Sequence, residues 1–205
     1  EPAYIKSQGV NGGLGNRLLG IVVDSSAGRI YISPSPEHEI IANSATGNWQ
    51  PGQEISYDPG SGAVFCVLYG LTHFGDLFSQ RQLSALNAFS DILSGLNSKV
   101  QEDCRLSGGE DISAGVATEY SIALQTYLSF VIDKCSDYWS TICGWHVSGE
   151  KMRNTFNRQA IPMTWDWAEA NPFCTASGNW LAMVEWVAKA IEVLPLRTPG
   201  KVFQD

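Results

Sequence analysis

The chain has 205 residues, of which 44% are hydrophobic and 17% are charged; this composition supports a sizeable core and excludes an intrinsically disordered protein. No apolar run approaches the roughly 18 residues of a membrane-spanning helix, and residues 1–4 lack the basic flank of a signal peptide. The net charge of −8 repels phosphate on average, so any contact with DNA needs a local basic patch.

The first part of the chain, residues 1–70, predicts a small β and loop region. Residues 18–23 and 29–32 are rich in strand-forming side chains, and the short segment between them ends in Gly28. This pattern is typical of a β-hairpin, in which a glycine near the turn accepts a backbone conformation that other residues avoid.

The segment after the hairpin predicts one short helix and then a loop. Pro34 ends the second strand, and residues 36–45 predict a helix that begins with a proline. His38 starts a zinc-protease pattern, but the position of the second ligand is Ala42, so we expect a solvated helix with no metal. Glycine, proline and polar residues dominate 46–62, which predicts an exposed loop.

A helix is predicted from residue 80 onwards. Ser79 and Gln82 have the spacing of a capping box, in which each side chain binds the backbone N–H of the other residue. Apolar side chains then recur at steps of three and four, at Leu83, Leu86, Phe89 or Ser90, Leu93, Leu96 and Val100. We expect this helix to end at residues 107–109, a serine followed by two glycines.

A second and longer helical pattern follows. Its apolar positions are Ala117, Tyr120, Leu124, Tyr127, Leu128, Val131, Cys135, Tyr138, Trp139 and Ile142. We expect the two helices to pack as an antiparallel pair, and a last helix over about 180–194 to end at Pro195. The predicted fold class is therefore α+β, with a β/loop region at 1–70 and a mainly helical region at 71–205, in one compact unit.

The five cysteines do not form a recognisable framework. Their number is odd, and no two have the spacing of a zinc knuckle. We interpret them as reduced thiols of a cytoplasmic protein, although two of them could still meet in space. The cysteines are Cys66, Cys104, Cys135, Cys143 and Cys174.

Patterns that indicate catalysis are all incomplete. The glycines between Gly9 and Gly15 match neither a dinucleotide fingerprint nor a phosphate-binding loop, and we expect a flexible entry loop there. Residues 171–173, Asn-Pro-Phe, resemble the motif with which amino-methylating enzymes hold their target amine, but the second proline is missing. We interpret them as a turn before the last helix, and we predict no catalytic residue.

The stretch 145–160 is the strongest candidate for binding. It carries Lys151, Arg153 and Arg158 against one acid, Glu150, in a chain that is acidic as a whole. It also contains asparagine, glutamine and aromatic residues, which suit phosphate contact, base-edge hydrogen bonds and base stacking. The predicted DNA contacts are Arg81, Lys151, Arg153, Asn154, Arg158 and Gln159. The alternative is a solvated helix whose aromatic residues, Trp145 and Phe156, belong to the core.

Several stretches in order resemble the large adenine-specific DNA methylases that carry a zinc ribbon within the chain. The matching stretches are 28–31 (GRIY), 69–83 (YGLTHFGDLFSQRQL), 154–163 (NTFNRQAIPM), 165–173 (WDWAEANPF) and 178–180 (GNW). In that family an adenosylmethionine-binding motif and the zinc-ribbon cysteines lie upstream of this region, and an Asp-Pro-Pro-Tyr catalytic motif lies downstream. The resemblance implies an internal segment of such an enzyme.

The resemblance implies a parent protein that transfers a methyl group from S-adenosylmethionine to the exocyclic amine of adenine in DNA. This segment would hold no cofactor and no active site of its own, and would orient DNA or recognise its target beside the remaining methylase core. Its apolar side chains, with seven tryptophans, suggest a face that the core covers, and hence possible self-association. The alternative is a structural or protein-interaction module that does not bind nucleic acid.

Overall fold

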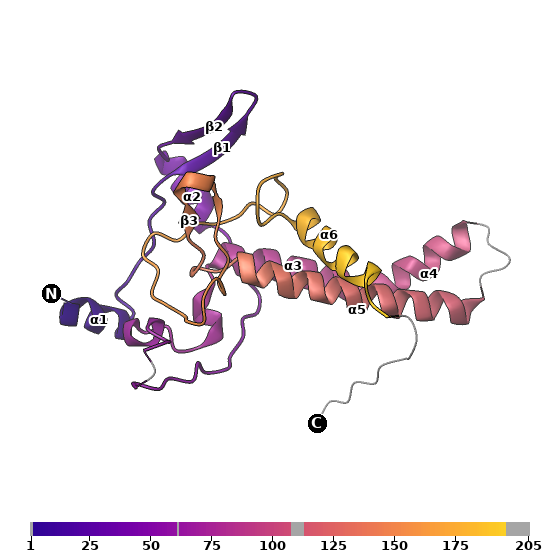
Figure 1. Ribbon diagram of the computed structural model, residues 1–205, viewed down its shortest axis with the longest axis horizontal. Helices are drawn as coiled ribbons and strands as arrows, with labels where there is room; N and C mark the ends of the chain where they lie inside the picture. The colour runs from indigo at the N-terminus through magenta and orange to yellow at the C-terminus, as the bar shows by residue number, and fades with distance from the viewer. Residues whose placement is uncertain (1, 61, 108–112, 196–205) are drawn as a thin grey trace.

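The computed structural model describes residues 2–60, 62–107 and 113–195, and this part of the chain is mainly helical with two small sheets. Figure 1 shows a helical half built on the long helix α5 and an irregular half from which the β1–β2 hairpin projects. The predicted α+β class is thus confirmed. The elements are α1 (Pro2–Val10), β1 (Ile21–Ser25), β2 (Gly28–Ile32), α2 (Pro36–Asn43), α3 (Gln80–Ser94), α4 (Leu96–Leu106), α5 (Ala114–Tyr138), β3 (Trp145–His146), β4 (Lys151–Met152) and α6 (Trp180–Glu192).

The predicted N-terminal hairpin is present. Strands β1 and β2 are antiparallel, and the pairing of Ser25 with Gly28 leaves a two-residue turn. Gly28 has φ +110°, a value that favours glycine, which explains its place at the end of the turn. Most side chains of both strands are exposed, so the hairpin extends from the surface and is not part of a core.

The flanking helices differ in how well the sequence predicts them. Helix α2 begins where expected, because the Ser35 side chain accepts from the backbone N–H of His38 and caps the first turn. Helix α1 contradicts the prediction of β and loop structure over 1–70, and of a flexible loop at Gly9. Helix α1 buries no side chain, so its sequence shows no apolar stripe from which a helix could be predicted. Gly9 lies within this helix and allows the close approach of the Tyr69 backbone.

The two long helical patterns form three helices. Ser79 and Gln82 form the predicted capping box at the start of α3. The prediction of a single helix up to residue 107 is wrong, because the helix is interrupted at Gly95 and continues as α4. Glycine favours such an interruption, since it costs about 1 kcal/mol relative to alanine inside a helix. The expected glycine break at 108–109 lies outside the described residues.

The predicted antiparallel packing of these helices is confirmed. Side chains of α5 bind the preceding helices in reverse order, with Gln125 donating to the carbonyl of Leu93 and Ser121 donating to Asn97. The predicted last helix, α6, is also present and contacts α5. It begins at a cap formed by Asn179, whose side chain accepts from the N–H of Ala182.

The main core lies where α3, α5 and α6 meet. Val131, Cys135, Trp139 and Met183 are buried there, and the ring of Phe89 stacks on Trp180 with centroids 4.2 Å apart. Trp139 follows the end of α5 and is 1% exposed, which shows that the apolar pattern continues past the helix.

A second core joins the early and late parts of the chain. Ile55, Cys66, Leu77 and Ile142 are buried together. Backbone hydrogen bonds link Ile161 to the segment around residue 65. The stretch between α5 and α6 is mostly irregular, although the sequence predicted a mainly helical region from residue 71. Contacts with the segment before residue 70 hold this stretch in place.

Candidate functional site

The basic stretch begins with a small hairpin and not with a helix. Strands β3 and β4 pair Trp145 with Met152, and Glu150 closes the turn between them at φ +44°. The β1–β2 hairpin supports this turn through Tyr31. The Tyr31 hydroxyl donates a hydrogen bond to the Glu150 carboxylate at 3.0 Å, and the Tyr31 ring lies edge-on to the Trp145 ring. Desolvation first, and then the Glu150 carboxylate, raise the pKa of Tyr31 above its usual value.

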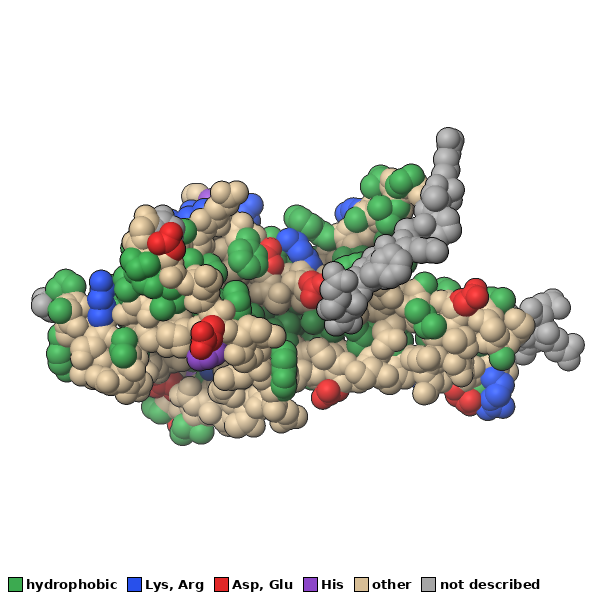
Figure 2. All heavy atoms as spheres, turned by 90° about the horizontal axis from the view of Figure 1, so that it is seen from below, with side chains coloured by type: hydrophobic (Ala, Val, Ile, Leu, Met, Phe, Trp, Pro, Cys, Tyr) green, Lys and Arg blue, Asp and Glu red, His purple; other side chains and the backbone are tan. Residues whose placement is uncertain are grey.

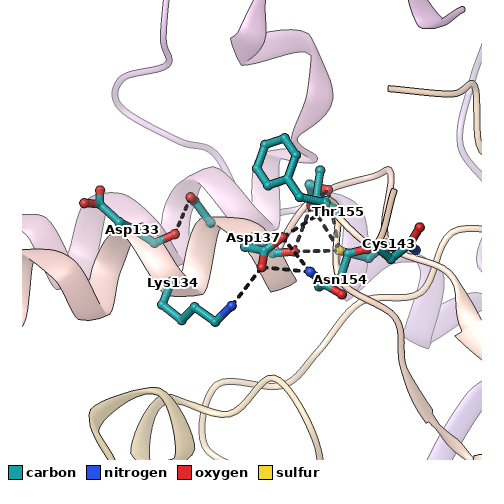
Figure 3. Close-up of polar contacts among 10 residues, drawn as sticks. Asp133, Lys134, Asp137, Cys143, Asn154 and Thr155 are labelled. Carbon is teal, nitrogen blue, oxygen red and sulfur yellow. Dashed lines mark hydrogen bonds and ion pairs between the residues drawn. The ribbon is translucent and has the colours of Figure 1, made fainter. Parts of the chain in front are cut away.

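Asp137, in the last turn of α5, holds the next part of the stretch. Its carboxylate accepts from the Asn154 side-chain amide at 2.9 and 3.1 Å and from the backbone N–H of Phe156 at 3.0 Å. Lys134 Nζ lies 3.0 Å from the same carboxylate (Figure 3). The Asp137 carbonyl accepts from both the N–H and the hydroxyl of Thr155. We call these contacts the Asp137 brace.

The brace leaves the cations of the stretch at the surface. Lys151, Arg153, Arg158 and Gln159 are all exposed. Within the described residues, six of eleven Lys and Arg side chains form ion pairs with acids, and Lys151, Arg153 and Arg158 are among the five that do not. Phe156 is 64% exposed, so the alternative of a solvated helix with this ring in the core is wrong.

The two other predicted contacts have partners inside the protein. Arg81 forms a bidentate ion pair with Glu169, with Nε 2.6 Å from Oε1 and Nη2 3.1 Å from Oε2, and it also donates to the carbonyl of Ala42. The Asn154 amide donates to Asp137, as described above. The structure therefore separates the predicted residues into four exposed side chains and two that hold the fold together.

A pocket lies beside the Arg81–Glu169 pair. Its volume is about 300 Å³, and its wall includes residues of α3, the end of α5 and the turn before α6. The lining residues are Arg81, Gln82, Ala85, Trp139, Glu169, Ala170, Asn171 and Pro172. The sequence did not indicate this pocket, because the capping box with Ser79 already accounts for a glutamine at position 82. The Asn171–Phe173 segment is a turn before α6, as predicted, with Phe173 N–H donating to the Asn171 side chain.

No protein-family model, curated protein or solved structure matches the chain. Across residues 2–60, 62–107 and 113–195, no three His, Cys, Asp or Glu side chains come together in a way that could hold a metal ion. In the same part of the chain, no helix is long and apolar enough to cross a membrane. All five cysteines are free.

Large apolar side chains are exposed on the helical half. Phe130 on α5 and Leu181 and Trp186 on α6 are each more than half exposed, and Phe173 in the preceding turn is 85% exposed. Figure 2 shows hydrophobic side chains at the surface of both halves on one face of the molecule.

Proposed function

We propose that this chain is an internal segment of an adenine-specific DNA methyltransferase and that it orients DNA for the parent enzyme. The exposed, unpaired cations of the basic stretch are the observation that carries the proposal. Among the described residues, Lys151, Arg153 and Arg158 have no acidic partner, and all three are exposed in a chain whose net charge is −8, so each can bind phosphate. Gln159 adds an exposed amide for a base edge.

The brace gives these cations a defined position. Asn154 and Arg81 are positioning residues in this proposal, because their side chains bind Asp137 and Glu169. A loop held by buried hydrogen bonds loses less freedom when it binds, which favours binding over a mobile loop of the same charge.

Two of the stretches that carry the family resemblance, 69–83 and 165–173, contact each other. Ser79 and Arg81, in the stretch 69–83, both bind Glu169, which belongs to the stretch 165–173. Six of the eight pocket-lining residues come from these same two stretches. The two stretches therefore belong to one unit of the fold, which any role for them in the parent enzyme would share.

In this proposal the chemistry belongs to the rest of the parent protein. S-adenosylmethionine would bind the remaining methylase core, which would also supply the catalytic motif. The segment contributes DNA contacts and a surface for that core. The exposed apolar side chains of α5 and α6 suit such a surface, and they could also support self-association.

The second candidate is a structural or protein-interaction module that does not bind nucleic acid. The exposed aromatic residues Phe130, Trp186 and Phe173 favour it, as does the pairing of Arg81 with an acid. The two candidates differ in one property, which is whether the basic stretch binds DNA with the salt dependence of phosphate contacts.

The test is a titration of the chain with short duplex and single-stranded DNA at several salt concentrations. We expect binding that weakens with salt, since each phosphate contact contributes a slope of about −0.9 on a double-logarithmic plot for duplex DNA. The double variant Arg153→Ala/Arg158→Ala should bind more weakly, and its slope should be shallower by about 2.

The matched control is Lys99→Ala/Arg105→Ala, which removes the same charge from exposed, acid-paired positions on α4. It should bind like the unmodified chain. Equal losses in both double variants would mean that only net charge matters, and the basic stretch would have no special role. Absence of binding at low salt would favour the protein-interaction module.

A further inference from the structure

The basic stretch contains one acid, and that acid is not paired with the cations beside it. Glu150 is the only aspartate or glutamate among residues 145–160; it directly precedes Lys151 and lies three residues before Arg153. Among the described residues, the ion pairs include none between Glu150 and either cation. Opposite charges this close in the sequence attract each other, so a competing partner for the Glu150 carboxylate decides how many cations remain unpaired.

That partner is Tyr31 on β2, 119 residues away in the sequence. The Tyr31 hydroxyl donates to Oε1 of Glu150 at 3.0 Å. The Tyr31 ring lies edge-on to Trp145, with ring centroids 6.4 Å apart, which places the hydroxyl beside the turn. Glu150 is the one non-glycine residue in the described part of the chain with a positive φ, and such a conformation persists where surrounding contacts fix it. The hydrogen bond from Tyr31 is one of these contacts.

Arg29 adds a positive charge to the same face of the hairpin. Arg29 and Tyr31 are two residues apart on β2, and side chains at this spacing point to one face of a sheet. The Arg29 guanidinium lies 5.9 Å from the centroid of the Trp145 ring and pairs with Asp24 at 2.9 Å. The hydrogen bond with Asp24 first, and then the charges of Asp24 and Glu150, raise the pKa of Arg29. The hairpin therefore offers the Glu150 carboxylate both a hydroxyl proton and a nearby cation.

We infer that Tyr31 is a positioning residue for phosphate binding by the basic stretch, because it occupies the Glu150 carboxylate and so leaves Lys151 and Arg153 unpaired. The inference rests on the proposed function, since it concerns how many cations the stretch offers to DNA. Without the Tyr31 hydroxyl, the released carboxylate pairs with one of these cations and removes it from phosphate contact. Tyr31 acts through Glu150 and needs no contact with phosphate.

Tyr31→Phe tests this role, because phenylalanine keeps the ring against Trp145 and lacks only the hydroxyl. The variant and the unmodified chain are titrated with a short DNA duplex and with inorganic polyphosphate, which presents phosphates without bases. We expect Tyr31→Phe to weaken both interactions about two- to fivefold, the order of one exposed ion pair. The slope of duplex affinity against salt should become shallower by about 0.9, the contribution of one phosphate contact. Tyr120→Phe, at an exposed position of α5, should bind as the unmodified chain does.

The Glu150→Gln background separates positioning from a merely structural role. With no carboxylate to release, Tyr31→Phe should change neither the affinity nor the salt slope in this background. A structural role for Tyr31 in the hairpin instead predicts the same loss of affinity whether or not Glu150 is present, and that result overturns the inference.

The contact between the two side chains has a spectroscopic signature. Desolvation first, and then the hydrogen bond with Glu150 and its charge, raise the pKa of Tyr31. The difference in ultraviolet absorbance between a chain and its Tyr31→Phe version, followed to alkaline pH, gives this pKa. Glu150→Gln should lower the pKa of Tyr31. An unchanged value would mean that the two side chains do not meet, which also overturns the inference.

The outcomes separate this inference from the DNA proposal. Weaker duplex binding by Arg153→Ala/Arg158→Ala, without any effect of Tyr31→Phe, leaves the DNA role standing and overturns the role of Tyr31. Polyphosphate binding that responds to Tyr31→Phe, without duplex binding, supports the role of Tyr31 and contradicts the DNA-orienting function. Absence of binding to both probes at low salt overturns both.

Discussion

The Asp137 brace provides the most direct test of how the structure positions the basic stretch. Asp137 is 8% exposed, and its carboxylate serves the Asn154 amide, the Phe156 N–H and Lys134. In Asp137→Ala two partly buried donors lose their acceptor, and each such loss costs about 1–3 kcal/mol. The ion pair adds little, because the Lys134 side chain is 29% exposed. We expect the free energy of unfolding to fall by about 2–6 kcal/mol.

Urea denaturation at neutral pH measures this loss, with Asp133→Ala as the matched control. Asp133 is exposed, one turn earlier on α5, and its side chain forms no ion pair in the described part of the chain. The control should change stability by less than about 0.5 kcal/mol. Amide exchange at residues 153–158 should also increase in Asp137→Ala. Equal stability of the two variants, or unchanged exchange at 153–158, would refute the brace.

Two further predictions concern the core. Gly178→Ala should destabilise the fold by about 1–3 kcal/mol in the same denaturation assay, because φ is +89° and the new Cβ would lie 2.8 Å from the Cβ of Ala170; Gly115→Ala, whose Cβ meets nothing closer than 3.8 Å, should cause no loss. Burial raises the pKa of Cys135 from 9.0 to about 12, so its thiol should resist alkylation in the native protein at pH 9 while Cys104 reacts. Because the pKa of Cys135 is higher in the folded than in the unfolded protein, the contribution of the buried neutral thiol to stability is complete below pH 9 and is lost as the pH rises towards 12. The free energy of unfolding, relative to that of Cys135→Ala, should therefore fall by about 1.4 kcal/mol between pH 8 and 10.

Local patterns predicted the helices well where an apolar stripe and a cap agree. The capping box at Ser79 and Gln82 and the stripe that includes Val131 and Cys135 led to the correct helices and to their antiparallel packing. Helix α1 was missed because it buries no side chain and thus leaves no stripe in the sequence. The break at Gly95 was missed because the apolar steps continue across it.

The candidate site was only partly predictable for a different reason. The basic side chains of 151–158 are local in sequence, and their exposure follows from that composition. The roles of Arg81 and Asn154 depend on Glu169, which is 88 residues from Arg81, and on Asp137, which is 17 residues from Asn154. Single-sequence patterns do not report such distant partners, and so the pocket between α3 and the turn before α6 left no signal.

The end of α5 joins the basic stretch to the start of the last helix. Asp137 anchors the loop that carries the cations, and two residues later the Trp139 ring donates to the carbonyl of Gly178, just before α6. One short segment therefore holds both the basic loop and the start of α6, so a substitution that displaces the end of α5 should loosen both at once.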